Sequence, residues 1–136
     1  MKLYNLNGRL ISKNFDRYRI NWGKKERSIF QTDVKRFLRP YLITHLVYSE
    51  FPLPGSRMKI DIFDFTSKIA YEISGRQHTE FVPHFHKSRS DFLGQIKRDM
   101  AKINFCEKNN ITLVEIYPDD LPLTKEWFAT KYNIYL

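Results

Sequence analysis

Two acidic residues stand in neighbouring strand-like segments of the sequence. Residues 58–65 read M-K-I-D-I-F-D-F and residues 69–74 read I-A-Y-E-I-S, and both runs are rich in the β-branched and aromatic residues that favour strands. Only T-S-K separates them, so we expect an antiparallel hairpin. Side chains alternate along each strand, and this pairing brings Asp61 and Glu72 together.

Two carboxylates in a half-buried sheet repel each other, and their burial without compensation is costly. A shared divalent cation would remove both problems, and oxygen ligands favour Mg²⁺ or Mn²⁺. Beside a phosphodiester, such an ion polarises a non-bridging oxygen and activates water for attack on phosphorus. The alternative is that Asp61 and Glu72 lie on a solvated face, paired with Lys59, Lys68 or Arg76.

The charge balance favours a polyanionic partner. The 136 residues include 23 Lys and Arg against 15 Asp and Glu, which gives a net charge of +8 and a pI near 9.6. Nucleic acid is the first candidate, although a basic surface also serves solubility alone. The single cysteine, Cys106, excludes an internal disulfide and a cysteine-based zinc finger. With no apolar run of signal-peptide or membrane-span length, we expect a cytoplasmic protein without a membrane partner.

Basic residues gather near the acidic pair and in the first part of the chain. Residues 13–27 interleave Lys and Arg with Phe15, Tyr18 and Trp22, which suits phosphate contact plus stacking but equally an ordinary amphipathic surface. A zinc site at His78, His84 and His86 is disfavoured, because they lie in an expected loop that contains Pro83 and lack paired cysteines. The residues predicted to contact DNA are Lys24, Lys25, Arg76, His78, Lys87, Arg89, Lys97 and Arg98.

Segments with helical periodicity precede and follow the predicted hairpin. Apolar residues recur at helical spacing from about Glu26 to Arg39, and Pro40 predicts the end of this first helix. Glu26 then lies in the first turn, facing inward with the apolar stripe. The type of residues 41–48 stays open. Near the end of the chain, residues 111–117 read as a buried strand and residues 124–131 as a helix.

A second helix is predicted from about Ser88 or Ser90 to residues 109–110. Its apolar positions, expected to form the buried stripe, are Leu93, Ile96, Met100 and Ile103. Beside them runs a polar stripe of Gln95, Asp99 and Lys102, which either faces the acidic pair or borders the core, with solvent slightly favoured. The order of elements predicts one α/β domain over residues 1–136, a mixed sheet flanked by helices.

This layout resembles the PD-(D/E)XK nuclease superfamily: a helix bearing Glu26, then Asp61, then Glu72-Ile73-Ser74 in the next strand. More narrowly, A-Y-E-I-S-G-R-Q-H is similar to the E-x-D-G-x-Q-H signature of nucleases related to the very-short-patch-repair endonucleases. The resemblance covers residues 24–117, leaving a basic and aromatic segment at 1–23 and an extension at 118–136. It implies a restriction-endonuclease-like core with the order αβββαβ.

The resemblance also implies roles for individual residues. Asp61 and Glu72 would bind the metal, and Glu26 would assist. Many members carry a lysine two residues beyond the strand glutamate, where this chain has Ser74, which has no charge with which to stabilise developing negative charge. Gln77 is our preferred substitute. The other candidates for that role are Lys97 and Lys102.

The expected function is therefore a Mg²⁺- or Mn²⁺-dependent DNA endonuclease of the phage or mobile-element kind, acting as a homodimer, with Glu26, Asp61, Glu72 and Gln77 as catalytic residues. Two alternatives remain. The first is a nucleic-acid-binding module that keeps the nuclease fold but does not cut, as Ser74 suggests. The second is a metal-dependent ribonuclease, because no residue can be assigned to sensing the sugar.

Overall fold

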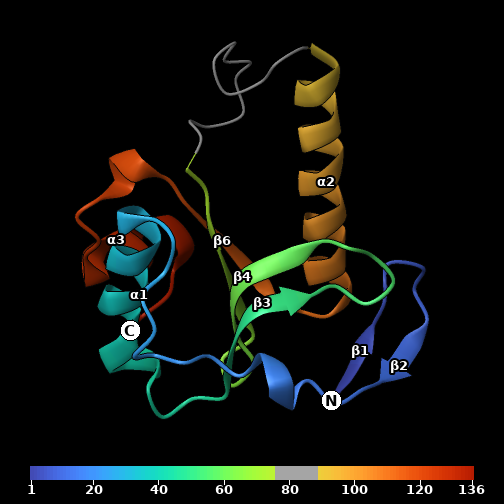
Figure 1. Cartoon of the computed structure of the whole chain (residues 1–136), viewed down its shortest axis with the longest axis horizontal. Helices are drawn as coiled ribbons and strands as arrows, with labels where there is room; N and C mark the ends of the chain where they lie inside the picture. Colours follow the sequence, from blue (N-terminus) through green and yellow to red (C-terminus); the bar gives the residue numbers. More distant parts are fainter. Residues whose placement is uncertain (76–88) are drawn as a thin grey trace.

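A four-stranded mixed sheet organises the chain, with strand order β3-β4-β5-β6. The computed structural model describes residues 1–75 and 89–136. The sheet consists of β3 (Val47–Pro52), β4 (Lys59–Asp64), β5 (Ile69–Ile73) and β6 (Thr112–Ile116). The first three strands are antiparallel neighbours, and β6 joins β5 in parallel (Figure 1). A fold of the α/β class is confirmed.

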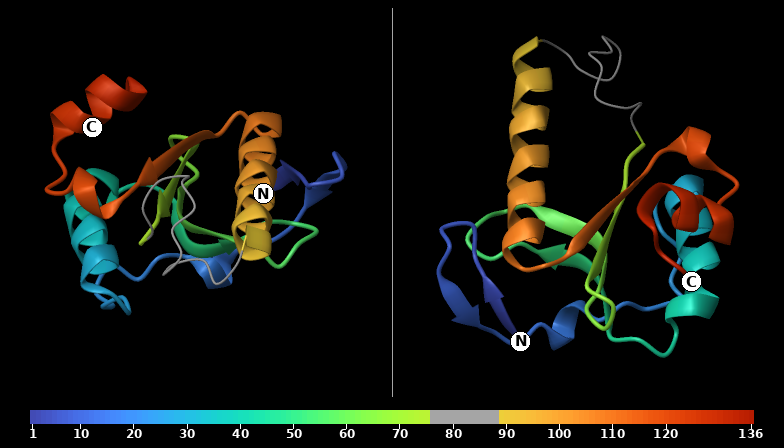
Figure 2. Two further views of the ribbon diagram at one scale, coloured as in Figure 1. Left: turned by 90° about the horizontal axis from the view of Figure 1, so that it is seen from above. Right: turned by 180° about the vertical axis from the view of Figure 1, so that it is seen from behind.

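Helices cover both faces of this sheet. α1 (Ile29–Leu42) and α3 (Lys125–Tyr132) lie on one side, whereas α2 (Arg89–Lys108) lies on the other and is the helix between β5 and its parallel partner β6 (Figures 1 and 2). A small hairpin of β1 (Lys2–Tyr4) and β2 (Leu10–Ser12) lies near the lower end of α2. The order from α1 to β6 is αβββαβ; of residues 41–48, whose type the sequence left open, the first two end α1 and the last two begin β3, the first of the three strands.

Two apolar clusters fix the layers. On the α1 side, Val34 and Leu38 pack with Ile62 and Tyr71 of the sheet and with Phe128 of α3. The opposite cluster joins the sheet to the last turns of α2 and to the N-terminal segment, and its members include Phe15, Phe51, Phe63, Phe105 and Cys106. Because side chains alternate along each strand, a single sheet can supply both clusters.

The predicted hairpin is confirmed in its register. Ile62 pairs with Tyr71 and Asp64 with Ile69, in an antiparallel arrangement. The connection between the strands is so short that this register follows from the turn and the apolar pattern together. Continuing the same register by one pair brings Asp61 level with Glu72, at the end of the sheet nearer α2 and away from the turn.

The bounds of α1 correct two predictions. The helix begins at Ile29, because Ser28 accepts a hydrogen bond from the Gln31 backbone N–H at 3.0 Å and caps it. Glu26 therefore precedes the helix instead of lying in its first turn. Pro40 does not end the helix, which continues to Leu42. The missing N–H of a proline removes one hydrogen bond, and so close to the C-terminus the remaining turns are unaffected.

The apolar stripe of α2 is not the buried face that the sequence predicted. Leu93 and Met100 are 57% and 58% exposed, and Ile103 is also exposed. The reason is visible in Figure 1: the helix extends past the sheet, so only its last turns, with Phe105 and Cys106, are buried. Within the described ranges 1–75 and 89–136, no helix combines the length and apolar character that crossing a bilayer requires.

Candidate active site at the end of the sheet

Asp61 and Glu72 form a carboxylate pair across β4 and β5, as the sequence predicted. The Ile73 backbone N–H donates to Asp61 Oδ2 at 2.8 Å, and the Asp61 backbone N–H donates to Glu72 Oε1 at 3.2 Å. Each side chain is thus held by the backbone of the strand that the other belongs to. This exchange fixes both carboxylates without neutralising them, because an amide donor carries no net charge.

The two carboxylates are electrostatically strained. Burial raises the pKa of Glu72 to about 7, and repulsion from Asp61 adds to the rise, against the opposing pull of Lys102. Burial likewise raises the pKa of Asp61; the Ile73 N–H and Lys102 act against it, while Glu50 and Glu26 add to it. The pair therefore favours any cation that can approach both carboxylates.

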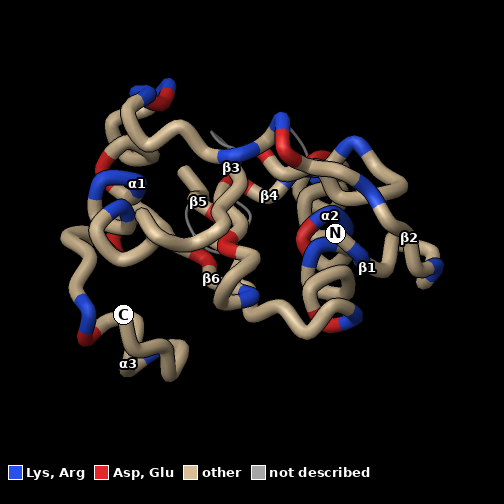
Figure 3. Tube along the Cα trace, turned by 90° about the horizontal axis from the view of Figure 1, so that it is seen from below, with Lys and Arg blue, Asp and Glu red and all other residues tan. Residues whose placement is uncertain are grey.

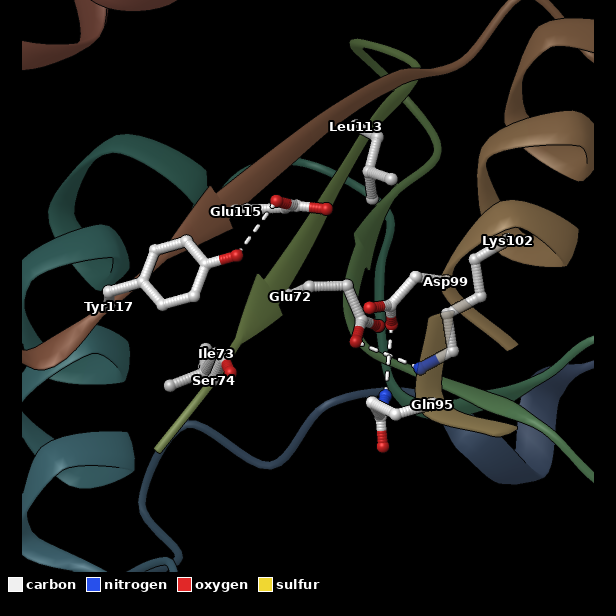
Figure 4. A pocket seen from close by; sticks show the side chains of 9 residues that line it. All are labelled: Glu72, Ile73, Ser74, Gln95, Asp99, Lys102, Leu113, Glu115 and Tyr117. Atoms are coloured by element: carbon white, nitrogen blue, oxygen red, sulfur yellow. Dashed lines mark hydrogen bonds and ion pairs between the residues drawn. The ribbon is translucent and has the colours of Figure 1, made fainter. Parts of the chain in front are cut away.

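Lys102 is the cationic side chain that contacts this pair. It lies on α2, and its Nζ is 2.9 Å from Glu72 Oε2, with each side chain 18% exposed (Figure 4). Lys102 and Lys97 were the predicted candidates to replace the absent motif lysine; Lys97 is exposed and does not line the site. The preferred candidate, Gln77, lies outside the described residues, as do Arg76, His78 and Lys87.

A hollow of about 160 Å³ opens between β5, β6 and α2, and Ser74 lies on its wall. Gln95 donates to Asp99 Oδ1 at 3.0 Å, one turn before Lys102, and Tyr117 donates its hydroxyl to Glu115 Oε2 at 3.0 Å (Figure 4). The slight preference for solvent as the environment of the polar stripe was wrong, since Gln95, Asp99 and Lys102 all line the hollow. This stripe faces the site because the apolar stripe of the same helix is turned outward.

A second hollow adjoins the pair on the α1 side. Asp61 lines it together with Glu26, Lys35 and Glu50. Glu26 is thus near Asp61 as predicted, but its Oε1 lies 3.0 Å from the Nζ of Lys35, which is 5% exposed. Sequence reasoning missed Lys35 and Glu50. Lys35 follows Val34 on the buried face of α1, where a charged residue is rare unless paired, so its position was a usable signal.

The donor set is compatible with a magnesium-type ion. Within residues 1–75 and 89–136, no group of three or more His, Cys, Asp or Glu side chains is placed to hold a metal. Two carboxylates nevertheless fit Mg²⁺, which keeps several waters and is commonly bound through one or two carboxylates plus substrate phosphates. The raised pKa values of Asp61 and Glu72, caused first by burial, indicate that ionising both carboxylates here is costly, and a bound cation would offset that cost.

Basic residues flank these carboxylates. Figure 3 shows Lys and Arg positions on α1 and α2 to either side of the central strands, which carry Asp and Glu. Lys24 and Lys25 are exposed beside α1, and Arg89, Lys97 and Arg98 are exposed on α2. The predicted basic surface therefore has two parts, one on each side of the sheet.

Comparisons with known proteins find relatives among viral proteins. The chain is 41% identical over 59 residues to uncharacterized protein 307L of Invertebrate iridescent virus 6, covering 43% of this chain and 30% of that protein. It is 28% identical over 99 residues to uncharacterized protein 033L of Invertebrate iridescent virus 3, covering 69% of this chain and 51% of that protein. It is 39% identical over 66 residues to uncharacterized protein 094L of Frog virus 3, covering 48% of this chain and 43% of that protein.

The chain thus spans between 30% and 51% of the length of these relatives. No protein-family model matches it, and no solved structure matches it. The comparisons therefore establish similarity to viral proteins, and the chemistry has to be argued from the site itself.

Proposed function

We propose that this chain is a metal-dependent nuclease that hydrolyses phosphodiester bonds, with DNA as its substrate. The observation that carries the proposal is the Asp61–Glu72 pair, fixed by backbone hydrogen bonds at one end of the sheet and contacted by Lys102 at 2.9 Å. A solvated, purely structural pair would relax away from repulsion, whereas these two carboxylates are held together. The αβββαβ order and the resemblance in the Glu72 segment support the same proposal.

Mg²⁺ or Mn²⁺ bound by Asp61 and Glu72 would polarise the scissile phosphate and lower the pKa of water. The two residues contribute ligands whose positions are set before substrate arrives, because each is tied to the opposite strand. Glu26 belongs to the neighbouring hollow, and its pairing with Lys35 leaves it a supporting position beside Asp61.

Lys102 supplies the charge that Ser74 lacks. Its ammonium group can stabilise negative charge that develops on the phosphate, or orient water, from a helix instead of from the strand. Its contact with Glu72 holds the side chain toward the hollow. Asp99, one turn earlier on α2, lines the same hollow and keeps the environment of Lys102 polar. This assignment makes Lys102 a stronger candidate than Lys97.

The test is cleavage of supercoiled plasmid, branched DNA, single-stranded DNA and RNA in Mg²⁺ or Mn²⁺. We expect the parent chain to cut DNA, and Asp61→Asn and Glu72→Gln to abolish cutting with folding and nucleic-acid binding retained. Glu107→Gln is the matched control, because Glu107 is an exposed carboxylate of α2 that does not line the site. Equal activity in all four proteins would reveal a contaminating nuclease and refute the assignment.

The binding-module alternative rests on Ser74, which leaves the strand without its usual lysine. It predicts salt-sensitive nucleic-acid binding that is indifferent to Mg²⁺, with no cleavage by the parent chain. The ribonuclease alternative predicts cleavage of RNA alone. Homodimerisation also stays a prediction, and sedimentation that finds only a fully active monomer would reject it.

A further inference from the structure

A basic hollow of about 190 Å³ lies between α1 and the segment that precedes it. Its main lining residues are Trp22, Lys24, Lys25, Lys35, Arg36 and Arg39. Lys35 and Arg36 lie four and three residues before Arg39, so each shares a helix face with Arg39. Among the residues that the structure describes, no carboxylate lines this hollow. It is therefore a concentrated source of positive potential within a chain that is already basic.

Hydrogen bonds hold the two sides of this hollow together, so it is more than a group of lysines on the surface. Lys35 Nζ donates to the Lys24 backbone carbonyl at 2.6 Å and to Glu26 Oε1 at 3.0 Å, which ties the preceding segment to α1. The Glu26 backbone N–H donates to Thr32 Oγ1 at 3.3 Å, a second tie between the same elements. Because Glu26 neutralises Lys35, the charge available in the hollow resides on the exposed Lys24, Lys25 and Arg39, together with the exposed Arg36, whose Nη1 lies 3.8 Å from Asp33 Oδ1.

Trp22 gives the hollow an aromatic wall. The indole is half-buried and packs against the apolar cluster between α1 and the sheet, so it is held in place on one side. Its other surface contributes to the lining. A fixed aromatic ring among cations is the combination on which unpaired bases stack while their backbone follows the positive charge. A duplex, whose bases are already stacked, has no use for such a ring.

The hollow also adjoins the candidate active site. Lys35 lines both the basic hollow and the hollow that contains Asp61. The Glu26–Lys35 ion pair thus marks the boundary between a region that attracts phosphates and one that carries uncompensated carboxylates. A strand whose phosphates lie against Lys24 and Arg39 would continue toward Asp61.

We propose that this hollow binds an unpaired nucleic-acid strand beside the cleavage site, with Trp22 stacking a base and Lys24, Lys25, Arg36 and Arg39 contacting its phosphates. The proposal rests on the proposed function, in that it names the substrate as a structure with a single-stranded portion, such as a flap, branch or overhang. It adds a strand-binding site on the side of the sheet opposite α2.

The test measures binding in EDTA, where cleavage cannot occur, using a labelled oligothymidylate of about 16 nucleotides, the matching oligouridylate and a blunt duplex. The double variant Lys24→Gln/Arg39→Gln is compared with Lys2→Gln/Arg9→Gln. The control removes one Lys and one Arg from the small N-terminal hairpin, so the change in net charge is identical. We expect the first variant to bind the single strands about tenfold more weakly and to lower the salt slope by about 1.4, or about 0.7 for each lost contact.

Trp22 is tested by fluorescence in a Trp127→Phe background, which leaves it as the only indole. Oligothymidylate should quench its emission, and Trp22→Ala should weaken single-strand binding about tenfold while Trp22→Phe retains most of it. Duplex binding should not respond to either change. Unquenched emission, or equal losses for duplex and single strand, would overturn the stacking assignment.

The two proposals fail in different ways. If Lys24→Gln/Arg39→Gln and its control bind alike while Mg²⁺-dependent cleavage by the parent is intact, the strand-binding site is wrong and the nuclease assignment stands. If single-strand binding depends on the hollow but nothing is ever cut, the strand-binding site stands and the nuclease assignment fails. Equal preference for oligouridylate would extend the ligand to RNA.

Discussion

Strand β4 carries two carboxylates in contrasting situations, Asp64 at one end and Asp61 three residues earlier. Asp64 is fully buried, with His45 Nδ1 2.8 Å from its Oδ2 and the Ser67 backbone N–H donating to its Oδ1 at 3.2 Å. It is thus satisfied by its own turn and by the loop before β3. Asp61 instead faces Glu72, and burial raises the pKa of both. Asp64 therefore has its partners within the fold, whereas Asp61 and Glu72 are two carboxylates beside one contacting cation, Lys102.

The largest expected difference between the two ends is in catalysis. Asp61→Asn should lower DNA cleavage by about 10³-fold or more, because it removes one of the two proposed carboxylate ligands. Asp64→Asn should leave the cleavage rate within about twofold of the parent, since it removes a charge of the same strand outside the site. Rates measured at saturating Mg²⁺ make the comparison. Equal loss in both variants would show that β4 as a whole, and not its end, supports activity.

The same pair of substitutions should have opposite effects on stability. In EDTA at neutral pH, Asp61→Asn relieves repulsion with Glu72 and should raise the free energy of unfolding. Asp64→Asn weakens a buried, hydrogen-bonded carboxylate and should lower it by about 1 to 3 kcal/mol. Urea unfolding measures both. A destabilised Asp61→Asn protein would mean that its hydrogen bond with Ile73 outweighs the repulsion.

Substitution of Lys102 tests whether its positive charge contributes to cleavage at the Asp61–Glu72 pair. Lys102→Met should reduce cleavage by about 10²-fold, and Lys102→Arg should restore part of it, because Lys102 contacts Glu72 and is the charge proposed to take the role of the motif lysine. Lys108→Met, six residues later on α2 and exposed, is the matched control. The pH profile is a second readout, since loss of Lys102 raises the pKa of Glu72 further and should move the profile to higher pH. An unchanged profile would place Lys102 outside the reaction.

The smallest effect concerns pH. The pKa of Glu72 in the folded chain is about 7, above its ordinary value of 4.5, so the folded state binds the extra proton between these values. That contribution to stability is fully present below about pH 4.5 and is lost as pH rises through 7. In urea unfolding measured at several pH values, Glu72→Gln should remove this dependence of the free energy of unfolding on pH, whereas Glu107→Gln should leave it unchanged. Added Mg²⁺ should stabilise the parent more at pH 8 than at pH 5.5, because the proposed metal site requires both carboxylates to be ionised.

The sequence predicted the parts of the site that depend on local pattern. Alternation and a short turn determined the register that brings Asp61 to Glu72. The position of Glu26 was wrong by a few residues because the Ser28 cap, and not apolar spacing, decides where α1 begins. The exposure of the apolar stripe of α2 could not be predicted for a different reason. Periodicity identifies an apolar stripe but does not say whether another element covers it. Whether Lys102 reaches the site depends on that orientation, so the sequence left it as one of several candidates to replace the motif lysine.

Cys106 makes it possible to measure how often the last turns of α2 separate from the sheet. It is buried among the last turns of that helix, four residues after Lys102, and burial raises the pKa of its thiol to about 12. A thiol reagent can therefore react only when this part of the helix separates from the sheet, and each such opening also withdraws Lys102 from Glu72. The alkylation rate of Cys106 therefore reports how often the contact between Lys102 and Glu72 is broken.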